Sequence, residues 1–183
     1  MGFEKTFEIL KPILPKKFDE NEWFTIFITI LVISVFSFLH KRNKTLLNTE
    51  IIGILLFNLL YTTVGCYFLA MDPYDFYDTV DHDSGEIMDI LLQNIVYPFT
   101  LLILMNYYAK NKPSNLLYII LGAGILYGLE WIGVEFFSLF TYKTWKSWYS
   151  LVFYFPVMIL NIIFYNKFHR YIKNKIEGNS RKN

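Results

Sequence analysis

The sequence is poor in cysteine, because Cys66 is the single thiol among its 183 residues. An intrachain disulfide is therefore excluded, and the loops must be held by packing. Cys66 stands inside an apolar run, where a cysteine usually acts as a small packing residue. HExxH, GxSxG, P-loop and CxxC motifs are also absent, so the usual hydrolase, nucleotide-binding and redox signatures are missing. We therefore expect no cofactor and no metal centre, and we favour a protein that is not an enzyme.

Charge of either sign is scarce, with 17 basic and 16 acidic residues and a formal net charge of +1. No basic stripe exists that could hold a nucleic acid, so we exclude that class of partner. Apolar residues make up 54% of the chain and aromatic residues 20%, with a mean hydropathy of +0.33. A soluble domain of this length could not bury so much apolar surface. The composition predicts an integral membrane protein whose first partner is the lipid bilayer.

Runs of about 20 mostly apolar residues are needed to span a bilayer as helices. Five such runs occur, at residues 23–40, 51–71, 87–108, 115–140 and 148–165. The breaks between them are short and polar, as expected for antiparallel neighbours in a bundle. The fold prediction is all-α, a polytopic transmembrane helical bundle of about five helices. No internal repeat is visible, which argues against an inverted-repeat transporter.

The distribution of Lys and Arg predicts the orientation. With five spans, six of these residues lie on the side of the N-terminus and eleven on the side of the C-terminus. Basic residues accumulate on the cytoplasmic side of membrane proteins. We therefore predict a multi-pass protein with the N-terminus outside and the C-terminus in the cytoplasm.

The chain divides into three parts around these spans. Residues 1–22 form an outer interfacial segment, either a short amphipathic helix that presents Phe3, Phe7, Leu10 and Leu14 or a mixed-charge tail. Residues 23–165 form the five-helix transmembrane domain. Residues 166–183 form a basic cytoplasmic tail that we expect to touch anionic lipid and then become disordered.

Three carboxylates fall inside the predicted spans, namely Asp89, Glu130 and Glu135, and no Lys or Arg falls there. A charge at the middle of a span costs about 2.5 to 3.5 kcal/mol on insertion scales, so depth matters. Asp89 and Glu135 are each within about three residues of an outer helix end. Glu130 lies about eight residues deep, or about 12 Å at 1.5 Å per residue. Glu130 and Glu135 are also about 140° apart around their helix, so they cannot face one substrate together.

A layer of polar residues is predicted at the depth of Glu130. It includes Gln93 and Asn94 in the third span and Tyr61 in the second. Our hypothesis is that Glu130 is a neutral acid hydrogen-bonded to Gln93, Asn94 or Tyr61, which would make it interhelical glue. The alternative is a site for a proton, a cation or a substrate. The candidate intramembrane polar site therefore comprises Glu130, Asp89, Gln93, Asn94, Tyr61 and Glu135.

Glycine and proline residues in the spans predict packing details. Gly124 and Gly128 are four apart, a spacing that lets a second helix approach closely, and we favour packing within the bundle over a dimer contact. Pro98 and Pro156 should kink their helices and free backbone carbonyls for Thr100 or for neighbouring helices.

An acidic connection joins the second and third spans. Residues 72–86 hold six acids and His82 but no Lys or Arg. Carboxylates can bind Ca²⁺ or Mg²⁺, yet the glycine spacing does not fit an EF-hand. We favour a solvated acidic loop.

Four stretches carry a resemblance to a known family. In chain order they are NLLYTTVG, DILLQNIVYPFT, YGLEWIGVEFF and YKTWKSWYSLVFY, and together they cover about residues 50 to 165. The chain resembles a family of small multispan membrane proteins without an established activity from spore-forming Gram-positive bacteria. The resemblance implies a bacterial plasma membrane and adds weight to Glu130, Trp145 and Trp148.

Three function classes remain open. The first, which we favour, is a non-enzymatic component that acts as a sensor, an accessory subunit or a small-ligand binder, with a membrane protein as a possible partner. The second is a small proton- or ion-coupled transporter that acts as a homodimer through Gly124 and Gly128. The third is an intramembrane enzyme acting on a lipid, and the angle between Glu130 and Glu135 makes it the least favoured.

Overall fold

The computed structural model describes residues 10–15, 17–80 and 86–180. Within these ranges, five helical segments are long and apolar enough to cross a membrane, which confirms the all-α bundle. They are α2 (Glu20–Asn43), α3 (Asn48–Ala70), the continuous segment α4 (Ile87–Leu91), η2 (Leu92–Val96) and α5 (Tyr97–Asn111), α6 (Asn115–Phe137), and α7 (Ser147–Ser180). The short helix η1 (Lys11–Ile13) precedes α2, and two strands, β1 (Tyr77–Thr79) and β2 (Phe140–Tyr142), lie in the loops.

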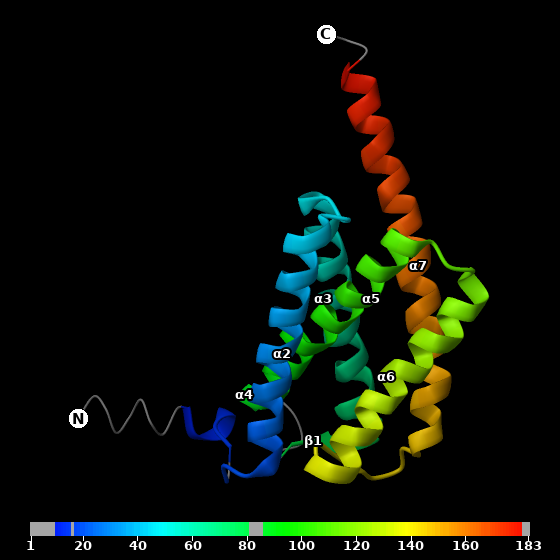
Figure 1. The fold of residues 1–183 in the computed structure, drawn as a ribbon. Helices are drawn as coiled ribbons and strands as arrows, with labels where there is room; N and C mark the ends of the chain where they lie inside the picture. Colours follow the sequence, from blue (N-terminus) through cyan, green and yellow to red (C-terminus); the bar gives the residue numbers. More distant parts are fainter. Residues whose placement is uncertain (1–9, 16, 81–85, 181–183) are drawn as a thin grey trace.

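The five segments run alternately up and down, and the two ends of the bundle differ (Figure 1). The start of α2 and strand β1 lie at one end, which we call the sheet end because β1 pairs there with β2. The C-terminal part of α7 projects beyond the other helices at the opposite end, which we call the tail end. The expected disorder of the tail is wrong for residues 166–180, because α7 continues to Ser180. Of the N-terminal segment, residues 1–9, including Phe3 and Phe7, lie outside the described residues.

Local chemistry explains where the helices begin and end. At the start of α2, Asp19 and Glu22 form a capping box in which the Glu22 carboxylate accepts the Asp19 N–H at 2.7 Å. Glu50 plays the same part at the start of α3, accepting the Leu47 N–H at 2.8 Å. The buried Glu50 also contacts His169 Nδ1 at 2.5 Å, which ties α3 to α7 at the tail end.

The core surrounds α5, which packs against α2, α3 and α7, while α6 packs mainly along α7. Fully buried apolar side chains fill the space between them: Ile54, Leu102, Met105 and Met158. Between helices in lipid, close packing of this kind is a main source of association, because lipid is itself apolar. The pairing of α6 with α7 decides the surroundings of Glu130.

A two-stranded antiparallel sheet joins the loop before α4 to the loop before α7, with Tyr77 opposite Tyr142. The predicted fourth span, residues 115–140, is too long, because Ser138 is in the left-handed region at φ 50° and ends α6 at Phe137. The acidic loop contains β1, and two of its carboxylates form ion pairs with Lys143. Lys143 Nζ lies 2.9 Å from Asp75 and 2.7 Å from Asp78. These hydrogen bonds, first with Asp75 and then with Asp78, raise the pKa of Lys143.

The glycines of α6 do not pack as predicted. A Cβ at Gly124 or Gly128 would meet no atom within 4 Å, so both positions face open space and not another helix of the bundle. The close approach occurs at Gly122, where a Cβ would clash with Cε of Met158 on α7. The preference for bundle packing at Gly124 and Gly128 was therefore wrong, and Gly122 fills that role because it is on the face of α6 that meets α7.

Near Pro98, the expected rescue of a freed carbonyl by a neighbouring helix is confirmed, whereas the expected role of Thr100 is not, because the carbonyl that Thr100 contacts is not one of those four or five residues before Pro98. Pro98 lacks an N–H, and the π-helical turn η2 precedes it. Thr100 Oγ1 donates to the Val96 carbonyl at 2.7 Å. Thr62 Oγ1 of α3 donates to the Gln93 carbonyl at 2.9 Å, so a neighbouring helix satisfies η2 as well.

A pair of buried amides joins α3 to α7. Asn58 Nδ2 donates to Asn161 Oδ1 at 2.8 Å, and Asn161 Nδ2 donates to Asn58 Oδ1 at 3.0 Å. Each amide also donates to the carbonyl four residues earlier in its own helix. Both side chains are at most 1% exposed. The pair satisfies its own hydrogen-bonding groups without water, as a polar contact in the membrane interior must.

Candidate functional site

A cavity lies in the half of the bundle nearer the sheet end, between α2, α3, η2 with α5, α6 and α7, and β1 and β2 contribute residues to its wall. Its volume is about 160 Å³. Of its 24 lining residues nine are aromatic, which are Phe24, Tyr61, Tyr77, Tyr97, Phe140, Tyr142, Trp145, Phe153 and Tyr154. The cavity therefore has the apolar and aromatic wall typical of small-molecule sites.

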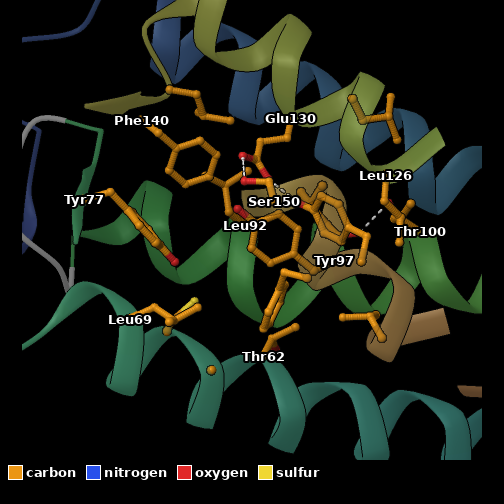
Figure 2. A pocket seen from close by; sticks show the side chains of 18 of the residues that line it. Thr62, Leu69, Tyr77, Leu92, Tyr97, Thr100, Leu126, Glu130, Phe140 and Ser150 are labelled. Carbon is orange, nitrogen blue, oxygen red and sulfur yellow. Dashed lines mark hydrogen bonds between the residues drawn. The ribbon is translucent and has the colours of Figure 1, made fainter. Parts of the chain in front are cut away.

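Glu130 of α6 brings a carboxylate to this cavity (Figure 2). Tyr142 of β2 donates its hydroxyl to Oε1 at 2.6 Å, and Ser150 of α7 also donates to Oε1. Tyr154 of α7 donates to Oε2. Ser150 and Tyr154 reach the same carboxylate because residues four apart lie on one face of a helix.

Trp145 extends this network by one hydrogen bond. Its indole Nε1 donates to Ser150 Oγ at 2.8 Å, so the single Ser150 hydroxyl proton remains available for Glu130. The Trp145 ring lies 5.7 Å from that of Phe76 and 6.1 Å from that of Tyr77, measured between ring centroids. Trp145 thus joins the sheet-end loops to the carboxylate.

Hydroxyl groups surround the Glu130 carboxylate. An ionised carboxylate only accepts hydrogen bonds, and all three of its partners are hydroxyl groups that can donate. Burial, and then the negative charge of Glu130, raise the pKa of Tyr142, so its phenol keeps its proton. Burial is also the largest cause that raises the pKa of Tyr77. The wall of the cavity therefore consists of neutral groups around one carboxylate.

The partners expected for Glu130 were wrong. Gln93 Nε2 donates to Asp89 Oδ2 at 2.7 Å, and Asn94 is exposed on the surface of the bundle. Tyr61 lines the same cavity, but the three hydroxyl donors to Glu130 come from elsewhere. The physical reason is that α6 packs along α7, so Glu130 meets side chains of α7 before it can meet those of η2.

The predicted polar layer thus separates into two parts. The side chain of Asp89 is buried, with 2% exposed, and it accepts a hydrogen bond from Gln93 of the same helical segment. Glu135 is exposed. The predicted inability of Glu130 and Glu135 to share a substrate agrees with this placement. Trp148, which the resemblance also emphasised, is 56% exposed and stands outside the cavity wall.

Sequence reasoning missed three residues of the site. Ser150 and Tyr154 lie in the predicted fifth span, and their spacing of four residues was a usable signal that they share a face. Tyr142 had no such signal, because its position depends on the pairing of β2 with β1.

Cys66 of α3 lines the same cavity. It is the single cysteine of the chain, so it provides a natural chemical label inside the candidate site. Within residues 10–15, 17–80 and 86–180, no group of three or more His, Cys, Asp or Glu side chains is arranged to hold a metal ion. Residues 81–85, with His82 of the acidic loop, lie outside these ranges.

No family model, no curated protein and no solved structure matches this chain. The assignment of a function therefore depends on the geometry of the cavity.

Proposed function

We propose that this chain is a non-enzymatic small-ligand-binding protein of the membrane, acting as a sensor or an accessory subunit. The observation that carries the proposal is a cavity with an aromatic wall and one carboxylate. Among the described residues of that wall, Glu130 is the single residue of the types Asp, Glu, Lys, Arg and His. A small apolar cavity with a few convergent polar groups is the usual form of a binding site.

The ligand-binding proposal predicts a change in the reactivity of Cys66. In purified protein, neopentylbenzene should slow the modification of Cys66 by methyl methanethiosulfonate several-fold, because an occupied cavity leaves less room for the reagent. The rate is measured by mass spectrometry. As a matched control, a Gly124→Cys variant in a Cys66→Ser background places the thiol on the open face of α6, where the probe should have no effect. Equal rates for Cys66 with and without any ring-sized probe would refute the proposal.

The orientation and the location are part of the same proposal. The Lys and Arg distribution supports a sheet end outside the cell, and the resemblance supports a bacterial plasma membrane. In a Cys66→Ser background, a cysteine at Tyr74 should react with an impermeant maleimide in intact cells, while cysteines at Lys112 and Lys175 should not. All three positions are exposed in the fold. Labelling at Lys175 from outside would reverse the orientation.

A second candidate is a small proton- or ion-coupled transporter that acts as a homodimer. The observation that favours it is the open face of α6 at Gly124 and Gly128, where a second copy could approach closely. Uptake of a cavity ligand into proteoliposomes, driven by a proton gradient, would support this candidate over a sensor.

A further inference from the structure

We propose that the ligand of the Glu130 cavity is a monovalent organic cation with an apolar body, such as a quaternary ammonium compound. This inference rests on the proposed function, since it names the class of ligand for the same cavity.

The charge of the cavity favours a cation. The described wall of the cavity contains the Glu130 carboxylate but no Lys, Arg or His. The nearby Lys143 of the sheet-end loops is paired with Asp75 and Asp78. A carboxylate in a low-dielectric site gains strongly from a positive charge, because Coulomb attraction is weakened little there. An anionic ligand would meet repulsion at the same place.

The aromatic wall of the cavity also favours a cation with an apolar body. The rings of Tyr77, Tyr97 and Phe140 stand around the space into which Glu130 points (Figure 2). Aromatic faces attract cations, most strongly when the contact is desolvated, and quaternary ammonium ligands are recognised in this way. A wall of aromatic rings with one carboxylate therefore matches both parts of such a ligand, the charge and the apolar surface.

The hydrogen bonds to Glu130 favour a ligand without N–H donors. The carboxylate has about four lone-pair positions, and the hydroxyls of Tyr142, Ser150 and Tyr154 occupy three of them. A ligand with many donors would have to displace these hydroxyls. A quaternary ammonium ion has no N–H group and needs only proximity to the charge, so it can be paired while the hydroxyl network stays intact.

The size of the cavity limits the ligand. Its volume of about 160 Å³ resembles that of an engineered protein cavity of about 150 Å³ that holds benzene. One ring with a small ammonium group is therefore a suitable probe. Benzyltrimethylammonium and neopentylbenzene have the same shape, and they differ in a charged nitrogen against a neutral carbon.

The test compares these two probes on the purified full chain, with protection of Cys66 from methyl methanethiosulfonate as the readout. We expect benzyltrimethylammonium to bind the parent at least about tenfold more tightly than neopentylbenzene, which corresponds to about 1.4 kcal/mol. Glu130→Gln should abolish this preference while neopentylbenzene still binds. Glu135→Gln removes an exposed acid of the same helix and should leave the preference unchanged.

The comparison of the two probes on the parent protein is a sufficient test of the cation proposal. The test therefore does not depend on the folding of the Glu130 variant. Equal affinity for the two probes, or tighter binding of the neutral one, would overturn the cation proposal and leave the ligand-binding function standing. If neither probe protects Cys66, both proposals fail. A preference that persists in Glu130→Gln would show that a group other than Glu130 attracts the cation, which contradicts the proposed role of Glu130.

Discussion

Replacement of Glu130 by leucine should lower the free energy of unfolding by about 2 kcal/mol or more. The variant leaves the hydroxyls of Tyr142, Ser150 and Tyr154 without their acceptor. Ser150 is buried and the two tyrosines are half-buried, and a buried polar group that loses its partner costs about 1 to 3 kcal/mol. Glu130→Gln should be much milder, because the amide keeps the shape and one acceptor oxygen, while a hydroxyl can rotate to accept from its NH₂ group.

The measurement is denaturant or thermal unfolding in a mild detergent, with Glu135→Leu as the control. Glu135 is five residues further along α6 and exposed, so its replacement should change stability little. Similar unfolding of the Glu130→Leu, Glu130→Gln and parent proteins would mean that the hydroxyl network does not stabilise the bundle.

The second large effect should appear at the amide pair between α3 and α7. Asn58→Leu or Asn161→Leu alone should destabilise the protein by about 1 to 2 kcal/mol, because the remaining amide loses an acceptor and a donor in the membrane interior. The double variant removes both amides and leaves no orphaned group. It should therefore recover to within about 0.5 kcal/mol of the parent.

A double-mutant cycle on unfolding free energies measures this coupling directly. Asn94→Leu supplies the control, because Asn94 is exposed on the surface of the bundle and should be replaceable without loss. Additive losses at Asn58 and Asn161 would show that the two amides act independently and would contradict the pairing.

The spans and the deep carboxylate were predictable from sequence because hydropathy and depth are properties of each run by itself. The bounds of α2, α3 and the segment α4, η2 and α5 agree with the predicted runs to within a few residues. The end of α6 was missed, because Ser138 and the pairing of β2 with β1 decide it.

The partners of Glu130 could not be predicted in the same way. Depth places Glu130 level with several polar residues on other helices, and it does not say which helix is the neighbour. The structure answers this through the packing of α6 along α7, which brings Ser150 and Tyr154 to the carboxylate and leaves Gln93 with Asp89. The same packing makes Gly122 the contact glycine in place of Gly124 and Gly128.

By itself, the sequence determined that the chain forms five apolar helices, that the five predicted apolar runs contain no Lys or Arg, and that Glu130 is the deepest acid in those runs. The tertiary structure decided which faces of the helices meet, and through them the cavity, the hydroxyl network and the Asn58–Asn161 pair. The physical reason is that an apolar run specifies crossing of the bilayer but is apolar on nearly all sides. The rotation of each helix and the choice of its neighbour follow from close packing and from the pairing of a few polar groups.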